Sequence, residues 1–228
     1  MVYKKNRHEL SSEVQLPKGS EDAFYFRDLL VYGLDAVANK ITEYDNEYNI
    51  SQHQKLNDAL LRFLNLDKNN NTTRIYTLNY DRLVPKILKQ NKIPVFDGFS
   101  DSTGAEYEEN YPVNEDKILE DFECLNYYNL HGSVYWRRTT DIANLNKAFC
   151  VYPNQEQANY TNQENETTSR DESFFASNIV TGYNKLQRTN LPPLNAFSYA
   201  FQRDCIEADT LVVVGYSFTD KHINRIIR

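Results

Sequence analysis

Apolar residues recur at helical spacing in several stretches of the chain. Between Ser20 and Ile41 they fall at every third or fourth position, which predicts one amphipathic helix. Residues 56–64 repeat the pattern, and the polar run DKNNNTT ends that second helix. Two further helices are predicted, one with an apolar stripe from Leu83 to Leu88 and one ending near Glu207.

Short runs rich in β-branched and aromatic residues lie between these helices. Residues 74–79 (RIYTLN) and 124–130 (CLNYYNL) predict strands, and residues 93–99 and 133–138 predict shorter ones. Residues 210–215 (TLVVVG) are almost continuously apolar, which is typical of a central parallel strand buried on both faces. Strands that alternate with helices predict an α/β fold, with a mostly parallel sheet flanked by helices.

Composition limits the possible functions. With 228 residues, the chain is long enough for a single domain over residues 1–228, in which the polar segment 154–173 is predicted to be a mobile loop. The net charge of −7 argues against partners such as nucleic acid or an anionic membrane. Three separated cysteines and the lack of any long apolar segment predict a reducing, cytoplasmic setting with no zinc ribbon.

Polar residues with useful chemistry follow three of the predicted strands. The first strand delivers Asn79 and Asp81, the second delivers His131, and the last delivers Gly215 and Ser217. Because ligands of open parallel sheets bind beyond the carboxyl ends of the strands, we expect these residues to converge on one cleft. His131 is the group in this set that titrates near neutral pH.

Each of these residues also has an ordinary structural explanation. Asp81 is, by base rates, more often a helix N-cap than a ligand, and Asn79 could satisfy backbone groups in the turn. Gly215 could serve only close packing or a positive φ angle, and a single histidine such as His131 is usually structural. The other three histidines have no supporting context and are interpreted as structural: His8, His53 and His222.

Three motifs, taken together, resemble the sirtuin-like superfamily. They are TLNYD (Thr77–Asp81), LHG (Leu130–Gly132) and VVVGYSFTDKHIN (Val212–Asn224), in the order in which the family carries them. The likeness is closest to bacterial sirtuin-like domains of anti-phage defence proteins. The resemblance implies a Rossmann-like fold and NAD as the substrate.

The resemblance also implies roles for individual residues. Asn79 corresponds to the asparagine that contacts the nicotinamide ribose and helps to place a water, and His131 to the catalytic base. For Asp220, a role as helix N-cap is as open as a ligand contact. The positions implied along the cofactor are Thr77, Asp81, Gly215, Ser217 and Asp220.

The implied reaction is hydrolysis of the bond between nicotinamide and ribose in NAD, without a metal. The family's deacylases carry four zinc cysteines that are absent here, and Leu78 replaces their usual glutamine, so protein deacylation is less favoured. Implied partners are further copies of the chain or other subunits of a defence system.

One family feature is not readable in the chain. The family begins with a strand and a glycine-rich turn that cradles the pyrophosphate, yet only Gly19 and Gly33 precede Asn79, and Gly33 lies within a helical pattern. We therefore expect the first strand and its loop to be lacking, as in a fragment or a truncated family member. This motivates an alternative function, a non-catalytic sensor of NAD or ADP-ribose or an assembly module.

Overall fold

The computed structural model describes most of the chain in separate stretches. These are residues 21–64, 73–99, 111–120, 124–138, 149–151, 165–167, 173–175, 178–180, 189 and 192–227. Ser20 and most of the segment 154–173 lie outside them. Within the described stretches, no helix is long and apolar enough to cross a membrane.

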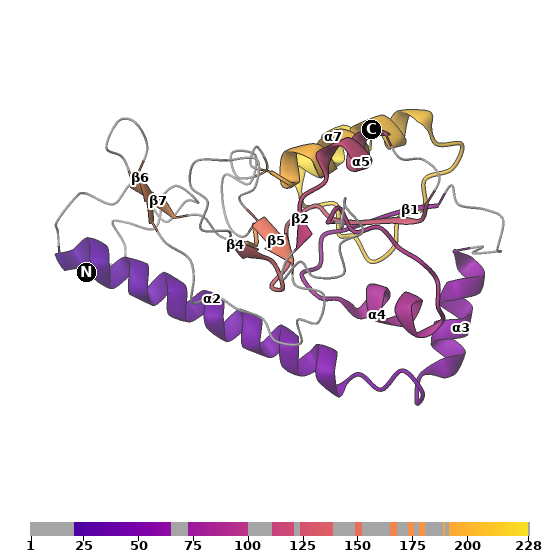
Figure 1. The fold of residues 1–228 in the computed structure, drawn as a ribbon, viewed down its shortest axis with the longest axis horizontal. Coiled ribbons are helices and arrows are strands. Elements are labelled where there is room, and N and C mark those ends of the chain that lie inside the picture. Colours follow the sequence, from indigo (N-terminus) through magenta and orange to yellow (C-terminus); the bar gives the residue numbers. More distant parts are fainter. Residues whose placement is uncertain are drawn as a thin grey trace.

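The described part of the chain contains both helices and strands. The helices are α2 (Glu21–Glu47), α3 (Gln54–Phe63), α4 (Leu83–Gln90), α5 (Glu115–Glu120), α7 (Leu194–Glu207) and α8 (Lys221–Ile226). The strands are β1 (Arg74–Thr77), β2 (Tyr111–Pro112), β3 (Asn126–Asn129), β4 (Arg137–Arg138), β5 (Phe149–Val151), β6 (Asn165–Thr167) and β7 (Ser173–Phe175). In Figure 1, α2 runs along one long edge, α5 and α7 run along the opposite edge, and β1 lies between them.

A small parallel sheet lies at the centre of the fold. Strands β1 and β3 pair in parallel, in a register that runs from Arg74 opposite Asn126 to Thr77 opposite Asn129. Phe96 forms a parallel bridge to Asn126 as well, so β3 has neighbours on both sides. All four residues of β3 are buried, as expected for a strand covered on both faces. The predicted α/β fold is therefore confirmed.

Helix α7 covers one face of this sheet. Five of its apolar residues are buried, between Leu194 and Phe201, and the ring of Phe197 stacks on Tyr128 of β3 with centroids 4.7 Å apart. Farther along the helix, Phe201 packs on Tyr76 of β1 with centroids 4.8 Å apart. The Asp204 carboxylate then pairs with Arg74, at 3.2 Å from Nε, and accepts a hydrogen bond from the Tyr76 hydroxyl.

Helix α2 supports the loop that follows β3. Leu34 and Ala38 on its inner face pack with Tyr135 of that loop in a second apolar cluster. Near the end of the helix, the buried Asp45 accepts a hydrogen bond of 2.6 Å from the Tyr135 hydroxyl and one of 3.1 Å from the Arg82 backbone N–H. Helix α2 is thus tied to residues that follow β1 and β3.

The prediction of a buried central strand at residues 210–215 is wrong. The structure forms no strand there, and the apolar side chains of residues 211–214 are exposed, from 42% at Val213 to 78% at Val214. A parallel strand needs neighbours that satisfy its backbone N–H and C=O groups. In the described part of the chain no strand pairs with this segment, so apolar composition alone does not bury it.

The shorter predicted strands are only partly present. Residues 93–99 form isolated bridges at Phe96 and Phe99 rather than a strand. Of residues 133–138, Arg137 and Arg138 form β4, whereas the preceding four are a buried turn. Strand β6 lies within the segment predicted as a loop, and it pairs as an antiparallel ladder with β7, which begins at the last residue of that segment.

Candidate active site

The end of β1 forms a tight turn that carries two of the predicted site residues. The Thr77 hydroxyl oxygen accepts a hydrogen bond from the Asn79 backbone N–H at 3.0 Å. The side-chain amide of Asn129, at the end of β3, donates to the Asn79 carbonyl oxygen at 2.9 Å. The two strand ends are therefore joined, and Asn79 itself is exposed to solvent at this edge of the sheet.

Asp81 makes a structural contact in this turn. Helix α4 begins at Leu83 with Arg82 at the N-cap, one residue later than predicted, so Asp81 is not itself the N-cap. Its carboxylate nevertheless accepts the Leu83 N–H at 3.0 Å, which satisfies one of the free donors of the helix start. Burial raises the pKa of this carboxyl, and the nearby charge of Asp45 acts in the same direction.

His131 follows β3 directly and is held by a backbone contact that requires glycine beside it. The His131 carbonyl oxygen accepts the Val180 N–H at 2.8 Å, and Gly132 adopts a φ of +83°. A Cβ atom at Gly132 would lie 2.0 Å from the Asn178 carbonyl oxygen, so no other residue fits there without a shift. The His131 side chain is 3% exposed.

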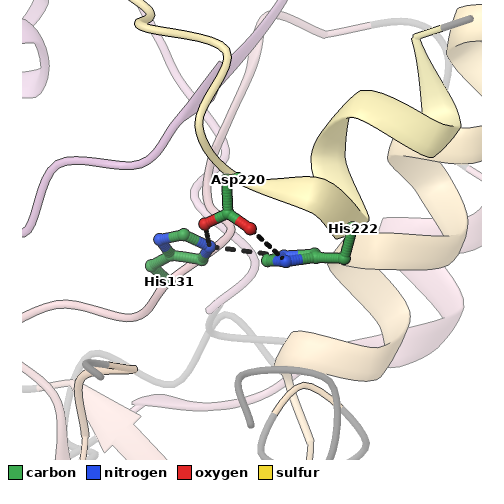
Figure 2. Close-up of side chains that lie close together, drawn as sticks. All are labelled: His131, Asp220 and His222. Carbon is green, nitrogen blue, oxygen red and sulfur yellow. Dashed lines mark hydrogen bonds and ion pairs between the residues drawn. The ribbon is translucent and has the colours of Figure 1, made fainter. Parts of the chain in front are cut away.

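The His131 ring meets Asp220 and His222 at the start of α8 (Figure 2). His131 Nε2 lies 3.3 Å from His222 Nε2 and 3.5 Å from Asp220 Oδ2. On the other side of its ring, His222 Nδ1 lies 2.6 Å from Asp220 Oδ1. A carboxylate oxygen accepts hydrogen bonds, so His222 Nδ1 is the donor in this short contact.

His222 was interpreted as structural, yet it lies in the same cluster as His131 and Asp220. Its ring joins the strand end that carries His131 to the Asp220 carboxylate. A signal was present in the sequence, because Asp220 and His222 are two residues apart directly after the GYS motif. Asp220 does occupy the N-cap position of α8, but its carboxylate is turned to the two histidines and caps no backbone N–H.

Gly215 and Ser217 lie on the exposed segment before α8. Gly215 has a φ of +67°, and nothing lies within 4 Å of a Cβ placed there, so its conformation rather than close packing favours glycine. The Ser217 hydroxyl shares a hydrogen bond of 3.0 Å with Thr219. In the described part of the chain, this contact joins Ser217 to its own segment and not to Asn79 or His131.

These features define a class of α/β domains in which a histidine-centred site lies beyond the carboxyl end of a parallel strand. Residues 73–228 match the family model of the SIR2-like domain, and the chain belongs to this family. The matched residues include β1, β3 and α8, and with them every residue of the site described above. SIR2-like domains use NAD as a substrate. No curated protein matches the chain.

Proposed function

We propose that this protein hydrolyses the nicotinamide–ribose bond of NAD to give nicotinamide and ADP-ribose. The observation that carries the proposal is the placement of His131. It is buried beside a carboxylate and lies at the same sheet edge as the exposed Asn79, in a family whose substrate is NAD. A general base must be correctly positioned, and Nε2 of this ring is in contact with His222 and Asp220.

Each group has a defined part in the proposed reaction. Asn79 holds a water molecule, whose oxygen attacks C1 of the ribose while the bond to nicotinamide breaks and its electron pair leaves with the ring. His131 accepts the proton that the water loses. The Asp220 carboxylate, 3.5 Å from His131 Nε2, stabilises the resulting imidazolium. The oxocarbenium-like transition state needs little more than positioning and electrostatic support.

We also propose a wider setting for this activity. The GYSFTDKHIN sequence from Gly215 to Asn224 resembles defence-type family members, which supports a role in bacterial anti-phage defence together with further copies of the chain or other subunits. The parallel pair of strands is proposed to belong to a Rossmann-like sheet. The parallel pairing of β1 with β3 supports this.

The test is nicotinamide release from NAD by the purified chain, measured by chromatography. His131→Ala is expected to lower the rate by about 100-fold or more, because it removes the proton acceptor. Asn79→Ala is expected to lower it as well, by releasing the water. His53→Ala is the matched control, since His53 is an exposed histidine at the start of α3 and should leave the rate unchanged. NAD loss that is equal in all three variants would contradict the proposal.

A second candidate function is a sensor that binds NAD or ADP-ribose without cleaving it. The observation in its favour is that segment 211–214 is exposed. Gly215 and Ser217 follow this segment and were expected to line the cofactor opposite Asn79 and His131. Calorimetry distinguishes the two functions. Tight binding of NAD with no nicotinamide released over a long incubation would support the sensor and contradict the hydrolase.

A further inference from the structure

We propose that His131, Asp220 and His222 form a binding site for a divalent transition-metal ion of the zinc type. Two imidazole nitrogens and one carboxylate oxygen are donors that Zn²⁺ and Co²⁺ accept readily. The three side chains come from two separate parts of the fold, the end of β3 and the start of α8. The sequence resemblance implied a reaction without a metal, and His222 was interpreted as structural.

Two of the separations between the donor atoms fit a tetrahedral ion. Bonds of about 2.0–2.2 Å at tetrahedral angles place two ligand atoms roughly 3.3–3.5 Å apart. His131 Nε2 lies 3.3 Å from His222 Nε2 and 3.5 Å from Asp220 Oδ2. Both distances match edges of such a tetrahedron. Each of the three residues offers a ligand atom within 4.8 Å of the other two, and Figure 2 shows the three side chains directed toward one another.

Metal binding would change the contact between Asp220 and His222. His222 Nδ1 lies 2.6 Å from Asp220 Oδ1, while His222 Nε2 faces His131. Because the two nitrogens point to opposite sides of the imidazole ring, a carboxylate bonded to Nδ1 cannot also reach an ion on Nε2. Binding therefore replaces the contact between Asp220 and His222 with a bond from the carboxylate to the ion, and Oδ2 is the oxygen closer to His131.

The surroundings select the type of ion. The side chains of His131, Asp220 and His222 are 3%, 11% and 10% exposed, so a bound ion would be largely shielded from water. Imidazole nitrogen is a poor ligand for Mg²⁺ and Ca²⁺, which prefer oxygen, and a good ligand for Zn²⁺, Co²⁺ and Ni²⁺. Three protein ligands leave one tetrahedral position for a water molecule.

The site has a consequence for catalysis that rests on the proposed function. A metal bound to His131 Nε2 takes the lone pair with which the imidazole would accept a proton. Zn²⁺ is then expected to inhibit NAD hydrolysis, and a chelator is expected to restore it. Metal binding itself is measured without NAD, so the metal site and the proposed hydrolysis can fail independently.

The experiment uses the full chain without a histidine tag, treated with a chelator and then dialysed. Co²⁺ is added and visible absorption is recorded, because tetrahedral cobalt gives intense bands that octahedral cobalt lacks. We expect one ion per chain with a tetrahedral spectrum, and Zn²⁺ should displace it. His222→Ala should weaken the affinity by about 10-fold or more. His53→Ala, which removes an exposed histidine stacked on Tyr48, should bind as the wild type does.

A second measurement covers variants that fold poorly. Zn²⁺ that binds the folded chain must raise the Tm of the wild type, and Asp220→Asn, which keeps the shape of the side chain, should reduce that rise. The proposal is overturned if Co²⁺ gives no tetrahedral bands. It is also overturned if His222→Ala and His53→Ala bind the ion equally well, since the three side chains would then form a hydrogen-bonded group without a metal.

Discussion

At the scale of single residues, Gly132 decides whether the His131 backbone can take its position. Its φ of +83° lies in the left-handed region, and a Cβ atom would overlap the Asn178 carbonyl oxygen. The Ser133 N–H donates to that same carbonyl oxygen at 3.1 Å, so the oxygen cannot move away without loss of a hydrogen bond. The glycine of the LHG motif is thus explained by the backbone contact next to the histidine.

Gly132→Ala is expected to lower the free energy of unfolding by about 2–4 kcal/mol, from backbone strain and the overlap together. The matched control is Gly33→Ala, because Gly33 lies in α2 and a Cβ there meets nothing within 4 Å. The control should raise stability slightly, by roughly 0.5–1 kcal/mol. Urea denaturation measures both, and equal effects in the two variants would refute this account of the motif.

Asp97 gives the fold a pH dependence. Burial raises the pKa of this carboxyl from 3.8 to about 6, although its oxygen accepts the Phe99 N–H at 3.1 Å. Because the folded state holds the proton more tightly than the unfolded state, the contribution of Asp97 is full below about pH 4 and is lost as the pH rises through about 6. At 1.36 kcal/mol per pKa unit, the loss is at most ~3 kcal/mol.

Asp97→Asn is expected to remove this dependence, because the amide stays neutral and keeps an oxygen acceptor for the Phe99 N–H. The difference in unfolding free energy between variant and wild type should shift in favour of the variant between pH 4 and pH 7. Urea denaturation at several pH values measures the shift. A constant difference over this range would show that Asp97 does not titrate in the folded state as described.

At the scale of whole elements, the local sequence pattern predicted those helices and strands whose own residues favour that structure. Helix α7 has an apolar stripe that meets the sheet, and β1 and β3 carry β-prone residues with polar ends. The strand predicted at residues 210–215 is absent. An apolar run favours a strand, but it does not supply the neighbouring strands with which that strand must pair. His222 was missed for a related reason, since its partner His131 lies 91 residues away in the sequence.

The exposure of segment 211–214 can be tested with a matched pair of valines. Val214 is 78% exposed, whereas Val134 in the loop after β3 is 0% exposed. Val134→Ala should cost about 1–3 kcal/mol of stability, because it leaves a cavity in a packed cluster. Val214→Ala should change stability by less than about 0.5 kcal/mol. Urea denaturation of the two variants measures this, and an equal cost would mean that segment 211–214 is buried in solution.

At the scale of the whole molecule, the site is assembled from two elements that lie far apart in the sequence. The end of β3 supplies His131, and α8 supplies Asp220 and His222, while α7 packs on β3 and contacts α8. The three motifs predicted the strand end and Asp220 as members of one site, and the family match covers them all. How the rings face one another could not be predicted, because it depends on the packing of α8 against the rest of the fold.

The buried carboxylate of Asp45 has a consequence for the limits of the folded unit. It lies on α2, outside residues 73–228, yet it accepts hydrogen bonds from Tyr135 and Arg82 within that range. Lys86 reaches back in turn, and its Nζ donates to the Asp45 carbonyl oxygen at 2.7 Å. A chain cut back to the recognisable family region would leave a buried tyrosine hydroxyl without its acceptor. The part of the sequence that identifies the family is therefore shorter than the part that holds its site together.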